Sequence, residues 1–133
     1  MKNNDTHNKQ PPSQMPTLRL VPLPADTNAY GDIFGGWLMS QMDLAGASEA
    51  TQYARGRVVT VGVDGMNFHK PVFVGDEVSF YTDIKHVGRT SIAVHVEAWA
   101  RARDDNKTRM VTEGVYTFVA IDEDRKPKEM KRK

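Results

Sequence analysis

Asp43 is the clearest candidate for a chemically active residue, because it lies inside a segment whose other residues predict an apolar helix. On a helical wheel it shares one stripe with Met39, Gly46, Ala47 and Ala50. A carboxylate in such surroundings can act as a general base or as a nucleophile. It can equally be a structural group held by backbone donors or by an arginine across a subunit contact. Its depth inside the helix excludes an N-terminal capping role.

Two glycines just before this segment, Gly35 and Gly36, favour a second kind of chemistry. The free N–H groups and the positive dipole at a helix start stabilise a carbonyl oxygen that gains negative charge. The glycines therefore predict an oxyanion site, or they only allow the helix to pack closely on a sheet. Asp32 lies nearer the helix start and fits the simpler role of an N-terminal acidic cap.

Other kinds of chemistry find little support in the composition. The chain has no cysteine, which excludes disulfides, thiolate nucleophiles and cysteine-bound zinc. Its histidines lack the spacing of helical metal ligands, so no metal site is predicted, and His69, His86 and His95 are expected to be exposed or satisfied. A net charge of +1 and the lack of a long apolar stretch favour no nucleic-acid or membrane partner. The polar start lacks a signal-peptide core, and we expect a cytoplasmic protein.

The elements that position these residues follow from hydrophobic periodicity. A helix is expected from residues 34–36 to Gly56, and strands over 17–23, 58–68, 77–87, 90–103 and 108–121. One helix and mainly antiparallel strands predict an α+β fold in which a curved sheet wraps the helix. The 133 residues suit one domain over 17–122. Residues 1–16 are expected to be disordered and residues 123–133 to form a charged, solvated tail.

A run of motifs adds a resemblance to a known family. The stretch from Asn28 through Gly35-Gly36 to Met42-Asp43 is followed by Lys70-Pro71, Gly75-Asp76 and residues 87–91. Together they resemble the hotdog-fold acyl-CoA thioesterases, in particular the bacterial YciA-like branch, over residues 18–122. The resemblance implies a long central helix wrapped by an antiparallel sheet, a dimer that joins two sheets, and a hexamer built as a trimer of dimers.

The resemblance also implies an activity and its residues. The reaction is hydrolysis of acyl-CoA to a carboxylic acid and free CoA, with no cofactor. Asn28 and Asp43 match the catalytic pair, contributed by different subunits, and the amides of Gly35 and Gly36 match the group that polarises the thioester carbonyl. Substrate contacts are implied at Phe34, Arg57, Gly88, Arg89, Thr90 and Ser91.

Two alternatives to this activity remain. A non-catalytic acyl-CoA binding or sensing module can share the same fold. A hotdog dehydratase is less favoured, because its histidine-centred chemistry has no matching motif here. Tyr30 departs from the smaller or polar residue common at its position, which leaves the acyl specificity open.

Overall fold

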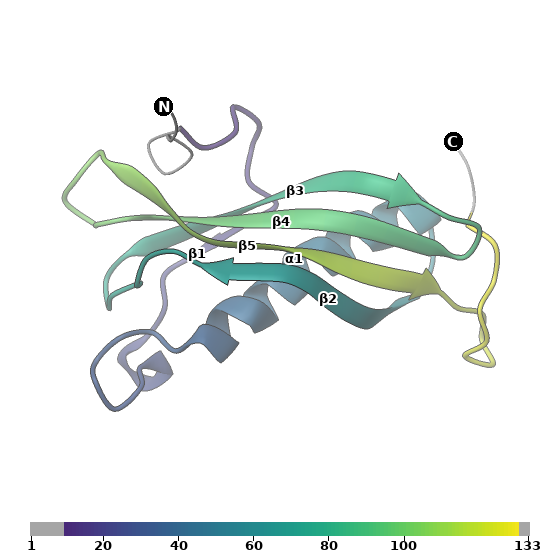
Figure 1. Cartoon of the computed structure of the whole chain (residues 1–133), viewed down its shortest axis with the longest axis horizontal. Helices are drawn as coiled ribbons and strands as arrows, with labels where there is room; N and C mark the ends of the chain where they lie inside the picture. The colour runs from purple at the N-terminus through teal and green to yellow at the C-terminus, as the bar shows by residue number, and fades with distance from the viewer. Residues whose placement is uncertain (1–9, 131–133) are drawn as a thin grey trace.

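One long helix lies across a single curved sheet of five strands (Figure 1). The computed structural model describes residues 10–130. In chain order the elements are β1 (Leu18–Leu20), the short 3₁₀ helix η2 (Pro24–Asp26), α1 (Gly35–Ala54), β2 (Val58–Phe68), β3 (Glu77–Val87), β4 (Ser91–Arg101) and β5 (Thr108–Ala120). The predicted α+β class is confirmed, and the ends of the elements shift by only a few residues.

The strand order β1-β3-β4-β5-β2 places the first two strands of the chain at opposite edges of the sheet. All neighbouring strands are antiparallel. β1 is shorter than the predicted strand over 17–23, and prolines at 22 and 24 follow it. Because proline has no N–H for the strand ladder, pairing with β3 ends there. β2 begins directly after α1 and crosses to the far edge beside β5.

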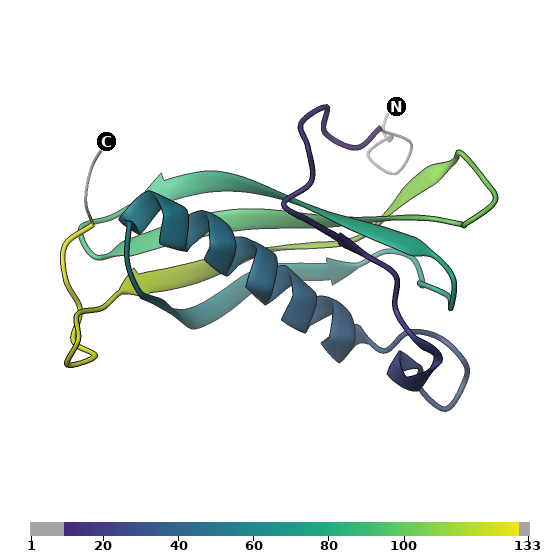
Figure 2. The ribbon, with the colours of Figure 1, turned by 180° about the vertical axis from the view of Figure 1, so that it is seen from behind.

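The helix buries one side against the sheet and leaves one flank open (Figure 2). Leu38 and Met42 are buried on the sheet side, each contributing roughly 1.5–3 kcal/mol by leaving water. On the other flank Leu44 is 60% exposed and Met39 37% exposed. The expected wrapping of the helix is therefore incomplete within one chain, because a single sheet covers a single side.

The two ends of the described chain are held against the sheet. Residues 10–16 contain no helix or strand, but the Gln14 side chain donates a hydrogen bond of 3.1 Å to the Thr82 carbonyl. After β5 the chain turns back, and the buried Met130 joins the core while its N–H donates to the Arg89 carbonyl. Residues 123–127 and 129 are exposed, as in a solvated segment, while the buried side chain of Met130 anchors the end of the segment to the core. The remaining parts of both predicted tails, residues 1–9 and 131–133, lie outside the described residues.

Residues 10–130 contain no helix that is both long enough and apolar enough to cross a membrane.

Gly46 sets how closely α1 approaches the middle of the sheet. A Cβ atom placed on Gly46 would lie 3.0 Å from the Phe118 ring and 3.5 Å from a methyl group of Val96. Phe118 is fully buried, so its ring has little room to move. The missing side chain therefore fixes the height of the helix above β4 and β5.

We expect Gly46→Val to destabilise the protein by about 1–3 kcal/mol, because the added methyl groups overpack the contact with Phe118. The free energy of unfolding, measured by denaturant titration at one fixed protein concentration, checks this. The matched control is Ser48→Val, which places the same β-branched side chain on an exposed position of the same helix. Equal destabilisation of both variants would contradict the contact with Phe118 as the cause.

Candidate active site

A cavity of about 300 Å³ lies at the start of α1. Its walls include Asn28 from the loop after η2, Gly35 from the first helical turn, and the neighbouring residues Phe68, His69 and Lys70 at the end of β2. Two of the residues selected from sequence, Asn28 and Gly35, are thus brought together. Since β2 runs back along the helix, its end returns to the helix start.

The loop that carries Asn28 is fixed by its own hydrogen bonds. The Asn28 Oδ1 atom accepts from the backbone N–H groups of Tyr30 at 2.8 Å and Asp32 at 3.1 Å. The Asn28 N–H donates to the Asp32 carbonyl at 2.7 Å, and Gly31 between them has a φ of +88°. Such a φ favours glycine, so Gly31 is required for the turn. The Asn28 Nδ2 group has no hydrogen-bond partner within residues 10–130.

The start of α1 presents backbone donors without a side-chain cap. Phe34 is the N-cap residue, and its side chain supplies no capping hydrogen bond. The predicted capping role of Asp32 is therefore wrong, because the helix begins only at Gly35. Among the described residues the amides of Gly35 and Gly36 have no acceptor, and the next amide, of Trp37, donates to the Phe34 carbonyl at 3.1 Å. These two amides can stabilise negative charge on a bound oxygen.

Asp43 is held by a donor from the neighbouring strand. Thr60 Oγ1 on β2 donates to Asp43 Oδ1 at 2.6 Å. Asp43 is half-buried in this chain, on the partly open flank of the helix. Burial raises the pKa of Tyr116 to about 12, with a further contribution from the negative charge of Asp43, so this phenol stays neutral beside the carboxylate. Thr60 was missed from sequence, because its pairing with Asp43 depends on how β2 lies along α1.

Asp43 and the helix start lie in different places on one chain. The cavity beside Gly35 is not lined by Asp43. Eight residues separate the two along α1, which is roughly 12 Å of axis at 1.5 Å per residue. A small reacting group cannot touch both within one chain.

The predicted substrate contacts divide between the two ends of the helix. Phe34 is half-exposed beside Gly36 at the helix start. Arg57 and Thr90 lie at the opposite end, where their carbonyls accept hydrogen bonds from Ile121 at 3.1 Å and Ala120 at 2.9 Å. The same β3–β4 turn comprises Gly88, Arg89, Thr90 and Ser91 and is closed by a bond of 2.8 Å from the Gly88 N–H to the Ser91 carbonyl. The 20 residues of α1 separate the two groups by roughly 30 Å.

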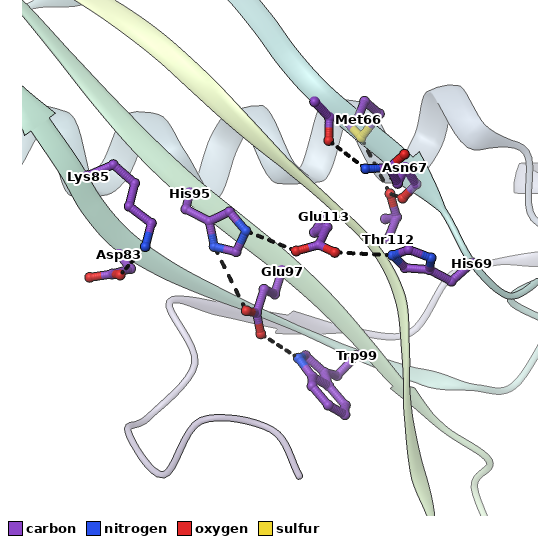
Figure 3. Close-up of polar contacts among 11 residues, drawn as sticks. Met66, Asn67, His69, Asp83, Lys85, His95, Glu97, Trp99, Thr112 and Glu113 are labelled. Atoms are coloured by element: carbon purple, nitrogen blue, oxygen red, sulfur yellow. Dashed lines mark hydrogen bonds and ion pairs between the residues drawn. The ribbon is translucent and has the colours of Figure 1, made fainter. Parts of the chain in front are cut away.

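A row of histidines and carboxylates lies on the sheet face away from α1 (Figure 3). Glu113 on β5 holds His69 through Oε2 at 3.2 Å and His95 through Oε1 at 3.1 Å. Glu97 accepts from the Trp99 indole N–H at 2.9 Å. Sequence reasoning expected both histidines to be exposed or satisfied, and they are half-buried and bonded. Their common partner was missed, because strand register decides which side chains meet.

The Glu113 carboxyl is kept ionised by this row. Burial raises its pKa, but the hydrogen bonds from His69 and His95 and the charges of the same rings outweigh burial, and its pKa lies below the ordinary value. His95, Glu97 and Glu113 also form a group whose possible metal-ligand atoms lie within 4.8 Å of one another. Helical ligand spacing in the sequence does not reveal this group, because its members lie on two neighbouring strands.

A long helix across one face of an antiparallel sheet, with bare amides at its start, defines a hotdog-fold protein with a site suited to acyl transfer. The family model of the thioesterase superfamily matches residues 30–105. The acyl-CoA thioester hydrolase YciA of Salmonella typhimurium is 49% identical over 114 residues, which are 84% of this chain and 86% of that protein. The chain belongs to the thioesterase superfamily.

Solved structures agree with this membership. A hexameric thioesterase from Yersinia pestis has 48% sequence identity and a TM-score of 0.85, over 92% of this chain and 99% of that chain. HI0827, described as a hexameric broad specificity acyl-coenzyme A thioesterase, has 45% identity and a TM-score of 0.86, over 95% of this chain and 87% of that chain.

The lowered pKa of Glu113 predicts a contribution to stability that depends on pH. Because the pKa is lower in the folded state, the contribution is present above the ordinary carboxyl pKa and is lost as the pH falls through the lowered value. We expect the unfolding free energy of Glu113→Gln to fall below wild type at pH 6–7, and the difference to shrink steadily below about pH 4.5. Denaturant titrations across this range, in buffer free of divalent metals, measure it.

The matched control is Glu129→Gln, which removes an exposed carboxylate 3.6 Å from Arg89. An exposed ion pair contributes little, so this variant should follow wild type at every pH. A Glu113→Gln difference that stays constant with pH would contradict the role of the histidine contacts.

Proposed function

We propose that this protein hydrolyses acyl-CoA thioesters to a free carboxylic acid and CoA. The observation that supports this most directly is the pair of unpaired amides at Gly35 and Gly36 beside Asn28, which suits a thioester carbonyl. The relatives named as acyl-CoA thioester hydrolases support the substrate class. A module that only binds acyl-CoA would need neither an oriented carboxylate nor an oxyanion site.

In the proposed reaction, the N–H groups of Gly35 and Gly36 donate hydrogen bonds to the thioester carbonyl oxygen. Asp43 takes a proton from a water molecule while the water oxygen attacks the carbonyl carbon. The tetrahedral intermediate collapses, the C–S bond breaks, and the CoA thiolate receives the proton. Direct attack by Asp43, with water then cleaving the acyl-enzyme anhydride, gives the same products. Asn28 Nδ2 orients the water or the thioester, and no cofactor takes part.

The geometry favours sites shared between subunits. Asp43 of one chain lies too far from its own helix start, so a neighbouring chain supplies the partner half. The half-exposed Leu44 on the flank that carries Asp43 is apolar surface that a second chain can cover. The hexameric assemblies of similar proteins support a trimer of such dimers.

The same assembly accounts for the substrate contacts at the far end of the helix. Arg57 and the turn from Gly88 to Ser91 lie about one helix length from the Gly35 amides of their own chain. We assign them to the CoA portion of a substrate whose thioester lies against a different subunit, with Phe34 beside the acyl group. A cytoplasmic location belongs to this proposal, because the charged nucleotide of CoA does not cross a membrane unaided.

We expect Asp43→Asn to lower kcat by about 10²–10⁴-fold, because the amide can neither accept the proton nor attack the carbonyl. Thr60→Val should lower kcat less and leave KM nearly unchanged, since it removes only the donor that orients Asp43. Release of free thiol from short-, medium- and long-chain acyl-CoA measures both. Asp104→Asn, in the exposed β4–β5 loop, is the control for loss of an acidic side chain.

Full activity of a folded Asp43→Asn protein would remove Asp43 from the mechanism. Tight acyl-CoA binding by wild type without thiol release would favour the binding module.

The shared site predicts that two inactive variants rescue one another. Asn28→Ala and Asp43→Asn place their changes in different halves of the site, so a mixed dimer has one site with both changes and one with neither. After co-refolding at equal amounts, random pairing should restore about a quarter of wild-type activity. Activity that stays at the level of the separate variants would show that both residues act within one chain.

A further inference from the structure

The group formed by His95, Glu97 and Glu113 plays no part in the proposed hydrolysis. It lies on the sheet face opposite α1, on the neighbouring strands β4 and β5 (Figure 3). Glu97 and Glu113 are direct cross-strand partners in the sheet register. Two carboxylates in this position repel one another, which destabilises a sheet unless positive charge is nearby.

Only histidines compensate this pair of carboxylates. Within residues 10–130, the ion-pair partners of Glu97 and Glu113 are His69 and His95. The nearby Lys85 is paired with Asp83 at 3.4 Å instead. No lysine or arginine among the described residues forms an ion pair with either carboxylate, so a bound cation would meet no competing lysine or arginine at this group.

Both carboxylates are oriented toward the same imidazole ring. The Trp99 indole holds Glu97 Oε1, and Glu97 Oε2 then lies 3.8 Å from His95 Nδ1. His69 holds Glu113 Oε2, and Glu113 Oε1 then lies 3.1 Å from His95 Nε2. In each carboxylate one oxygen is held by an outer hydrogen bond and the other faces His95, Glu97 at Nδ1 and Glu113 at Nε2. An ion on Nε2 would take the place of the Glu113–His95 hydrogen bond, and the Glu97 carboxylate would turn toward that nitrogen.

The distances and surroundings also suit an ion. Ligand atoms around an ion with bonds of about 2.0–2.2 Å lie roughly 3–4.4 Å apart, so a group within 4.8 Å can close on one by small side-chain movements. The three side chains are 19%, 23% and 26% exposed. A cavity of about 320 Å³, lined in part by His95 and Glu97, adjoins the group and has room for coordinating water.

We propose that His95, Glu97 and Glu113 bind a divalent transition metal ion of the Zn²⁺ class, with water from the adjoining cavity completing its coordination. One imidazole and two carboxylates suit Zn²⁺ better than Mg²⁺, which prefers oxygen ligands and retains its water. The three ligand side chains lie on the other face of the sheet from α1, and His69, which holds Glu113, is the residue that this group shares with the cavity at the helix start.

Isothermal titration of the full-length protein with Zn²⁺ alone, after removal of bound metal with a chelator, tests the proposal. We expect one Zn²⁺ per chain at this site, no comparable binding of Mg²⁺, and loss of the Zn²⁺ signal in His95→Gln. Trp99→Phe keeps all three ligands but releases Glu97, and should weaken binding by about 10-fold. His86→Gln removes an exposed histidine of β3 outside the group and should bind as wild type.

Zn²⁺ binding that is absent in wild type, unchanged in His95→Gln, or equally reduced in His86→Gln would overturn the proposal. Circular dichroism confirms the folding of each variant. Should His95→Gln fail to fold, Glu97→Gln removes a different ligand and gives the same distinction.

Discussion

The rise of the helix is the constraint on which the rest of this structure depends. At 1.5 Å per residue, the helix that carries the bare amides of Gly35 and Gly36 must carry Asp43 well away from them. No rotation of side chains closes this separation, because the backbone is fixed by its own hydrogen bonds. The chemistry of one chain is therefore divided, and a complete site requires a second copy.

The sheet fixes the positions of these separated groups. Gly46 allows α1 to lie close to Phe118, and β2 returns beside the helix from Val58 to Phe68. One strand then serves both halves, with Thr60 holding Asp43 and Phe68 lining the cavity at the helix start. A small change in helix height would disturb both positions together, since they share one strand and one helix.

Local sequence patterns were enough to predict the helix and the strands. They were not enough to predict the contacts between distant segments of the chain. The period-two alternation of β3 and β4 and the apolar pattern around Met42 depend only on neighbouring residues. The contact of Thr60 with Asp43 and the shared bonding of Glu113 depend on strand order and register, which a single sequence does not specify. Met130 was missed for a related reason, because one apolar residue in a charged segment forms no pattern.

The strand order also has a consequence for synthesis on the ribosome. The apolar side of α1 is covered by β3, β4 and β5, all of which are made after it. The helix therefore leaves the ribosome tunnel before the surface that buries it exists, and its apolar side is exposed during that interval. Chains that expose apolar surface before the segments that cover it are made are prone to aggregation during synthesis. Residues 77–120 must therefore be synthesised before the apolar side of α1 can be fully buried.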